Sequence, residues 1–304
     1  MYDPKLILAQ KIKRNECLDN ILNSKASRKI IVAGPGTGKT YTFCQILKNN
    51  NSNNNLVMTF MRKLVEDMQG DFGEYAEVKT FRAYCKKILH EINGKVELIP
   101  YLSQVIKKDS ELLGMNYNNF DAKFQTFDED SPAIKFYLDR GDYYEVVSFN
   151  DSVYRLYKIL QRDNSIIPHF DQILIDEFQD FNSLEVAFIT EMEKKGSILI
   201  VGDDDQAVYS GRSSSPNHLR EKYCSGEYEI FELPFCSRCP KVIIEAINAF
   251  ILEVQKNGHL NERINCRYEA YLEGKEYENE KYSKIITAQL SNIKIIPKYL
   301  FTEI

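Results

Sequence analysis

The sequence predicts an α/β fold built on a parallel sheet. Short apolar runs such as 172–175 and 197–201 are bounded by polar residues. Such runs are typical of buried parallel strands, whose two faces are both covered by helices. Helical patterns, including 40–48 and 81–92, alternate with these runs, which favours a parallel sheet. Between about 93 and 148 the strand rhythm disappears and the sequence becomes polar and aromatic, which predicts a mostly helical insertion.

Composition limits the classes of protein that fit. A chain of 304 residues with 43% hydrophobic content can bury one substantial core and carry a second module. The net charge of −5 does not predict a polyanion partner, so any nucleic-acid binding must depend on local contacts. The N-terminus lacks a signal-peptide pattern and no apolar run approaches the length of a membrane span, so we expect a cytoplasmic protein without a membrane partner. Seven cysteines, an odd number, favour reduced thiols.

A glycine-rich turn between a predicted strand, 30–32, and the predicted helix 40–48 is the strongest local signal. It matches the phosphate-loop pattern ending in G-K-[ST], although the first glycine of the strict pattern falls on Ala33. Glycines let backbone N–H groups and the helix N-terminus face phosphate oxygens. The alternative is a turn that binds nothing, but it leaves the Lys-Thr pair unexplained. The predicted nucleotide-binding residues are Gly34, Gly36, Thr37, Gly38, Lys39, Thr40, Tyr41 and Asp176.

Acidic residues follow the predicted strand 172–175, at the edge where open α/β sheets bind ligands. We expect Asp176 and the Thr40 hydroxyl to hold Mg²⁺, and Glu177 to act as the base that activates water. The next strand, 197–201, leads to Gln206, which can contact the γ-phosphate. Either of the two polar segments that follow these strands would, taken alone, also fit a charged loop. Together with the phosphate loop they predict ATP hydrolysis.

These three elements, in this order, resemble the superfamily 1 helicases of the UvrD/Rep/PcrA family between about 28 and 247. The resemblance implies a RecA-like P-loop NTPase with ATP and Mg²⁺ between two RecA-like lobes. Single-stranded or partly duplex DNA would lie across the first lobe. The implied domains are a RecA-like ATP-binding domain (1–92 and 149–232), a helical insertion (93–148) and a partial second RecA-like domain (233–304).

The resemblance also implies contacts with DNA. Phe60 ends a predicted strand where a base can stack, and Arg82 replaces the histidine that is usual in the family's next DNA-contact motif. Each aromatic residue taken alone fits a core position equally well. The implied DNA-binding residues are Thr59, Phe60, Arg62, Thr80, Phe81, Tyr209 and Arg212.

The fourth family motif implies that Arg238 is an arginine finger, with a solvated arginine as the alternative. Ser237 replaces the tyrosine that stacks on adenine in the family, which leaves Phe235 or Tyr41 as candidates for base recognition. Gln10 lies further from Lys39 than the family's adenine-binding glutamine would. Gly211 replaces a bulky aromatic residue, which removes one stacking platform.

The family's remaining motifs are missing between 241 and 304, where a helix over 239–254 and an apolar run over 285–296 resemble only the opening of the second domain. We therefore expect a DNA-dependent ATPase that is incomplete as a motor and that a protein partner can complete. The alternative is a non-motor regulatory or scaffold subunit that binds nucleotide and DNA. A P-loop kinase is disfavoured because no acceptor site is recognisable. Cys236 and Cys239, with Cys224 and Cys266, offer a weak zinc pattern, and buried thiols are the preferred interpretation.

Overall fold

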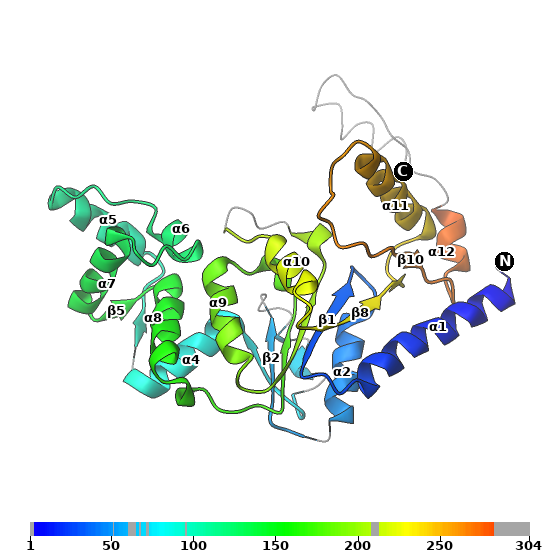
Figure 1. Cartoon of the computed structure of the whole chain (residues 1–304), viewed down its shortest axis with the longest axis horizontal. Helices are drawn as coiled ribbons and strands as arrows, with labels where there is room; N and C mark the ends of the chain where they lie inside the picture. Colours follow the sequence, from blue (N-terminus) through cyan, green and yellow to red (C-terminus); the bar gives the residue numbers. More distant parts are fainter. Residues whose placement is uncertain are drawn as a thin grey trace.

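The computed structural model describes residues 3–50, 52–59, 65–66, 68–70, 73–94, 96–207 and 213–282. Its centre is a six-stranded sheet in the order β3-β2-β6-β7-β1-β8, in which every adjacent pair is parallel (Figure 1). The predicted α/β class with a parallel sheet is therefore confirmed. The strands are β1 (Arg28–Ala33), β2 (Asn55–Thr59), β3 (Glu77–Thr80), β6 (Gln172–Ile175), β7 (Ser197–Gly202) and β8 (Glu229–Leu233).

Successive side chains of the central strands enter two different cores. In β1, Ile30 and Val32 face one core while Ile31 and Ala33 face the other. This alternation explains why these strands are apolar throughout, because helices cover both faces of the sheet. One face packs against α4 (Phe81–Asn93), α8 (Phe149–Arg162), α9 (Ser183–Met192) and α10 (Asn217–Cys224), and the other against α1 (Pro4–Asn23) and α2 (Lys39–Asn49).

The predicted insertion contains three helices and a short parallel strand pair, and it lies at one end of the sheet (Figure 1). Aromatic rings form its core: Tyr137 contacts Phe120 and Phe124, with 5.1 Å between ring centroids in each pair. Helix α8 packs on α4, α6 and α9, so the insertion shares its core with one face of the sheet. Its elements are β4 (Glu97–Leu98), α5 (Leu102–Leu112), α6 (Phe120–Gln125), α7 (Pro132–Tyr144) and β5 (Val146–Val147).

A small unit follows β8 and lies beyond the carboxyl end of β1 (Figure 1). It comprises β9 (Phe235–Cys236), α11 (Lys241–Lys256), β10 (Glu269–Ala270) and α12 (Glu276–Lys281), with β9 and β10 paired in parallel. Helix α11 begins two residues later than the predicted helix 239–254, since Pro240 is its N-cap and proline favours helix starts. The predicted apolar run 285–296 lies outside the described residues.

Helix α1 joins this small unit to the sheet. The Gln10 side chain donates to the Ala270 carbonyl (3.0 Å) and accepts from the Leu272 N–H (3.1 Å). Both ends of its amide are therefore used by backbone, so Gln10 serves as a structural clamp in this structure. Further along the helix, Arg14 stacks on the Tyr271 ring at 4.6 Å from its centroid. Among the helices of the described residues, none is long and apolar enough to cross a membrane.

Short 3₁₀ turns complete the fold. They are η1 (Asn164–Ile166), η2 (Phe178–Asp180) and η3 (Asp204–Gln206). The last two follow β6 and β7 directly, at the carboxyl edge of the sheet. That edge therefore carries the polar residues that the sequence singles out.

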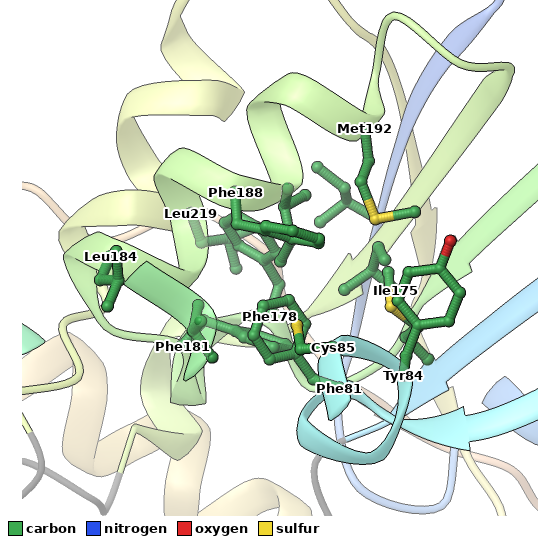
Figure 2. Packing of buried hydrophobic residues seen from close by; sticks show 14 of the residues in the cluster. Phe81, Tyr84, Cys85, Ile175, Phe178, Phe181, Leu184, Phe188, Met192 and Leu219 are labelled. Atoms are coloured by element: carbon green, nitrogen blue, oxygen red, sulfur yellow. The ribbon is translucent and has the colours of Figure 1, made fainter. Parts of the chain in front are cut away.

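The aromatic cluster beneath this edge generates a stability prediction. Phe188 is fully buried and meets Phe81 edge-on, 5.4 Å between ring centroids (Figure 2). We expect Phe188→Ala to lower the free energy of unfolding by about 3–5 kcal/mol, because it leaves a cavity in a packed core. Phe250, which is 68% exposed, supplies the control: Phe250→Ala should change stability by at most about 0.5 kcal/mol. Urea unfolding of both variants measures the difference, and equal effects would contradict the packing described here.

Candidate nucleotide site

The phosphate loop connects β1 to α2 and has the backbone that the glycine pattern predicts. Gly36 and Gly38 have φ of 70° and 96°, in the left-handed region that favours glycine. The Thr37 hydroxyl donates to the Gly34 carbonyl at 2.9 Å and closes the turn. Gly38 is the N-cap of α2 and makes no side-chain cap, so the first N–H groups of α2 can face an anion.

Two acidic residues lie opposite the loop, at the end of β6. Asp176 is 2% exposed and accepts the Glu177 N–H at 3.0 Å. Burial and, next, the neighbouring Glu177 charge raise the pKa of Asp176 to about 7, while the positive charge of Lys39 opposes both. Glu177 has φ of 52°, which is unusual for a residue with a side chain and is found at functional sites.

Glu177 is held from two directions. Lys39 Nζ lies 2.8 Å from Glu177 Oε1, and Gln179 Nε2 donates to Glu177 Oε2 at 2.9 Å. The lysine and the glutamate are both largely buried, with side chains 13% and 21% exposed, so water screens their attraction only weakly. The structure thus brings together the predicted phosphate-binding lysine and the predicted base.

A third strand extends this hydrogen-bonded group. The Asp203 N–H, at the end of β7, donates to Gln179 Oε1 at 3.1 Å, and Gln206 Nε2 donates to Asp203 Oδ2 at 2.7 Å. A chain of polar contacts therefore runs from Lys39 to Gln206. Burial raises the pKa of Asp203, while the Gln206 hydrogen bond opposes the shift. Gln179 and Asp203 were not among the predicted site residues, although both lie in the polar segments that follow the predicted strands 172–175 and 197–201.

The turn after β9 lies directly on the phosphate loop. The Ser237 N–H and hydroxyl both donate to the Gly36 carbonyl, at 2.9 and 3.0 Å. A Cβ atom at Gly36 would lie 2.2 Å from Arg238 Cβ, and one at Gly34 would lie 2.6 Å from Tyr268 Cζ. The predicted arginine finger thus starts beside the loop, with an exposed side chain. Nothing in the sequence predicts that Tyr268 lies against Gly34.

Two residues were proposed for base recognition, and the structure separates them. Tyr41 lies in the first turn of α2 and is 58% exposed. Phe235 is 2% exposed and packs against Tyr271, so its ring has no free face for a base. Arg14 lies near the loop as well, since a Cβ at Gly38 would come within 3.4 Å of its Nη2. Tyr41 is the candidate that remains.

The structure describes only some of the residues that are predicted to contact DNA. Thr59 and Thr80 are register partners at the ends of β2 and β3, which places them together at the carboxyl edge of the sheet. Thr59 is fully buried, which corrects the expectation that its side chain contacts DNA, and Thr80 caps α4 by accepting the Ala83 N–H. The Phe81 ring is 2% exposed and packs against Phe181 and Phe188 in the core, which corrects the expectation that it contacts DNA (Figure 2). Phe60, Arg62, Tyr209 and Arg212, like Gly211, lie outside the described residues.

Among the described residues, one group of potential metal ligands lies within shared reach of an ion, Asp203 to Asp205. Arg220 pairs with Asp204 at 2.7 Å and Arg263 with Asp205 at 2.8 Å, so cations of the protein already engage these carboxylates. The weak zinc pattern gains no support in this part of the chain. Cys236 and Cys266 are buried thiols, and Cys236 Sγ donates to the Pro35 carbonyl at 3.0 Å.

Parts of the chain are similar to known proteins. The AAA domain family matches residues 16–212, which is more than half of the chain. The DNA helicase II of Haemophilus influenzae is 27% identical over 150 residues, covering 48% of this chain and 20% of that protein. An ATP-dependent helicase/nuclease subunit of Clostridium beijerinckii is 27% identical over 174 residues, covering 50% and 14%. The probable DNA helicase II homolog of Mycoplasma genitalium is 22% identical over 285 residues, covering 74% and 40%.

These relatives confirm the resemblance to UvrD/Rep/PcrA-type helicases that the motifs indicate. The chain spans 40% or less of the length of each of the three. The likeness therefore concerns one part of these longer proteins.

The close approach of Arg238 to the loop is testable with two glycine variants. Gly36→Ala and Gly226→Ala both force an alanine into left-handed backbone (φ of 70° and 74°), which costs about 1–2 kcal/mol. Only Gly36 has a neighbour in the way, because the space around Gly226 is open within 4 Å. We expect Gly36→Ala to lower the Tm more than Gly226→Ala in thermal unfolding. Equal losses would show that Arg238 does not rest on the loop.

Proposed function

We propose that this chain, which belongs to the AAA domain family, binds and hydrolyses ATP with Mg²⁺ as the motor site of a UvrD-like DNA helicase. The contact between Lys39 and Glu177 at 2.8 Å, beside the buried Asp176, carries the proposal. A phosphate-binding cation, a base and a metal-binding carboxylate are the parts that phosphoryl transfer to water requires.

The contacts suggest an order of events. The γ-phosphate of ATP competes with Glu177 for Lys39, since both are anions within its reach. Glu177 then becomes free to take a proton from the attacking water at Oε1, while Gln179 keeps the carboxylate oriented through Oε2. Gln206 lies at the end of the same polar chain, where its amide can respond to the γ-phosphate. Arg238 extends from beside Gly36 to neutralise the charge that develops on transfer.

Mg²⁺ fits the residues present. The Thr40 hydroxyl and the Asp176 carboxylate are hard oxygen donors, which this ion prefers. The raised pKa of Asp176 shows that burial disfavours its negative charge. A cation bound at Asp176 would compensate this charge. When bound, the ion neutralises phosphate charge and orients the transferred group.

Single-stranded DNA is the proposed partner at the carboxyl edge of β2 and β3. The register pairing of Thr59 with Thr80 supports this place, because it brings two of the motifs that the resemblance implies to one edge. Phe60, Arg62, Tyr209 and Arg212 remain proposed contacts. Several relatives of this chain are named as one subunit of an ATP-dependent helicase/nuclease. We therefore also propose that translocation depends on a further polypeptide region or on a partner protein.

Steady-state ATP hydrolysis by the 304-residue chain, with and without single-stranded DNA, tests the proposal. We expect DNA to stimulate turnover, and Glu177→Gln to lower it by about 10²- to 10⁴-fold, because the amide cannot accept the water proton. Glu253→Gln is the matched control, since this glutamate is 67% exposed on α11 and should leave turnover unchanged. If the parent chain binds nucleotide but hydrolyses it no faster than Glu177→Gln, with or without DNA, the result would instead favour a non-motor binding module.

Removal of the metal gives a second test. Chelation of Mg²⁺ should weaken ATP binding to the parent chain, because the ion no longer neutralises the phosphate charge beside Asp176 and Glu177. Asp176→Asn should respond much less to chelation, because the variant has already lost the carboxylate that holds the ion. Titration with a fluorescent ATP analogue measures both responses. The same response in both proteins would exclude Asp176 as the metal-binding group.

A further inference from the structure

The turn after β7 concentrates three consecutive negative charges in a partly buried place. Asp203 and Asp204 are 2% and 5% exposed, where like charges repel more strongly than in water. Each carboxylate is nevertheless held. Their partners are Gln206 Nε2 for Asp203 (2.7 Å), Arg220 Nε (2.7 Å) and the Ile264 N–H (3.0 Å) for Asp204, and Arg263 Nε for Asp205 (2.8 Å).

Arg263 and Ile264 are the two partners that come from the segment after α11. The Arg263 side chain is 4% exposed, and its Nε lies 2.9 and 2.8 Å from the two carboxylate oxygens of Asp205. Burial disfavours its charge, but the hydrogen bond and attraction from Asp205, followed by Asp204 and Asp203, raise the pKa of Arg263. A planar guanidinium binds with fixed geometry, which a lysine cannot reproduce.

The same guanidinium also fixes the segment that covers the phosphate loop. Arg263 Nη2 donates to the Cys266 carbonyl at 2.9 Å, two residues before Tyr268. The Tyr268 ring lies against Gly34, and its own carbonyl accepts from Asn248 of α11 at 2.8 Å. Arg263 therefore makes two kinds of hydrogen bond: through Asp205 to the turn that carries Gln206, and through the Cys266 carbonyl to the segment that carries Tyr268.

A cavity of about 190 Å³ lies between these parts and is lined by Pro35, Asp205, Gln206 and Tyr268, among others. The two walls are not packed tightly against each other there. Polar contacts beside the cavity join the two sides: Arg263 bonds to Asp205 and to the Cys266 carbonyl, and the Ile264 N–H bonds to Asp204.

We propose that Arg263 is a positioning residue for the nucleotide site, acting through Asp205 on Gln206 and through Cys266 on Tyr268. It extends the polar chain that runs from Lys39 through Glu177, Gln179 and Asp203. A movement of the small C-terminal unit is thereby transmitted to the γ-phosphate contact. This inference rests on the proposed ATP hydrolysis, but its structural part is testable without turnover.

Arg263→Lys in the full chain is the first test, because it keeps the charge and loses the forked geometry. We expect kcat for ATP hydrolysis to fall about 10- to 100-fold while KM changes by less than about 3-fold, since misplacing a group that acts in the transition state affects kcat. Arg267→Lys is the matched control, an exposed arginine in the same segment. A loss of Tm in Arg263→Lys with kcat and KM unchanged would overturn the proposal and leave a purely stabilising ion pair.

Asp205→Asn provides a second variant that leaves Arg263 in place, in case the lysine variant does not fold. It should shift kcat in the same direction, and the double variant should be no worse than the more damaging single one, because both remove one interaction. Additive losses would show that the two residues act separately and would overturn the proposal.

Hydrogen–deuterium exchange gives a readout that does not need activity. We expect Arg263→Lys to increase deuterium uptake at 203–207 and at 34–38, with no change at 149–162, relative to the parent and to Arg267→Lys. If the parent chain hydrolyses no ATP, the proposed function fails, and the exchange result alone decides whether Arg263 positions the two segments. Unchanged uptake at both segments would overturn it.

Discussion

The ion pair between Lys39 and Glu177 is the contact on which the arrangement of the site depends. It joins the carboxyl ends of β1 and β6, which are not neighbours, because β7 lies between them. The pair depends on the register of three parallel strands. Ile175, the last residue of β6, and Ile30 of β1 both pair with Ile200 of β7, and β1 continues beyond this level to Ala33, where the phosphate loop begins. Burial of those apolar strands therefore determines where the charged groups meet.

Much of this arrangement follows from the sequence because its chemistry is local. The phosphate loop, the acidic pair and Gln206 each lie directly after a buried strand, so strand and function are predicted from one short run. Boundaries differ by a residue or two: α2 covers Lys39–Asn49 where 40–48 was expected, and α4 covers Phe81–Asn93 where 81–92 was expected. The contact between Gln179 and Asp203 joins the ends of two neighbouring strands, β6 and β7, so both residues are recognisable in the sequence once the strand order is known.

The contacts that the sequence does not reveal link distant parts of the chain. Ser237 binds Gly36 across 201 positions, and Arg263 binds Asp205 across 58. No periodicity encodes such pairs. Phe81 shows a different limit, because a motif gives the identity of a residue but not the side of the helix that it faces. The amphipathic pattern of α4 turns that ring into the core, beside Phe181 and Phe188.

Helix α1 has a consequence for how the chain folds. Gln10 reaches its backbone partners at Ala270 and Leu272 across 260 and 262 positions, among the longest sequence separations in the described chain. On a ribosome, the helix therefore emerges long before the segment that it clamps. Loop closure of this length is slow and raises contact order. The sheet core can collapse first, and docking of residues 268–272 onto α1 and the phosphate loop becomes a later step, so a nascent chain can cover its phosphate loop only after residue 272 has been synthesised.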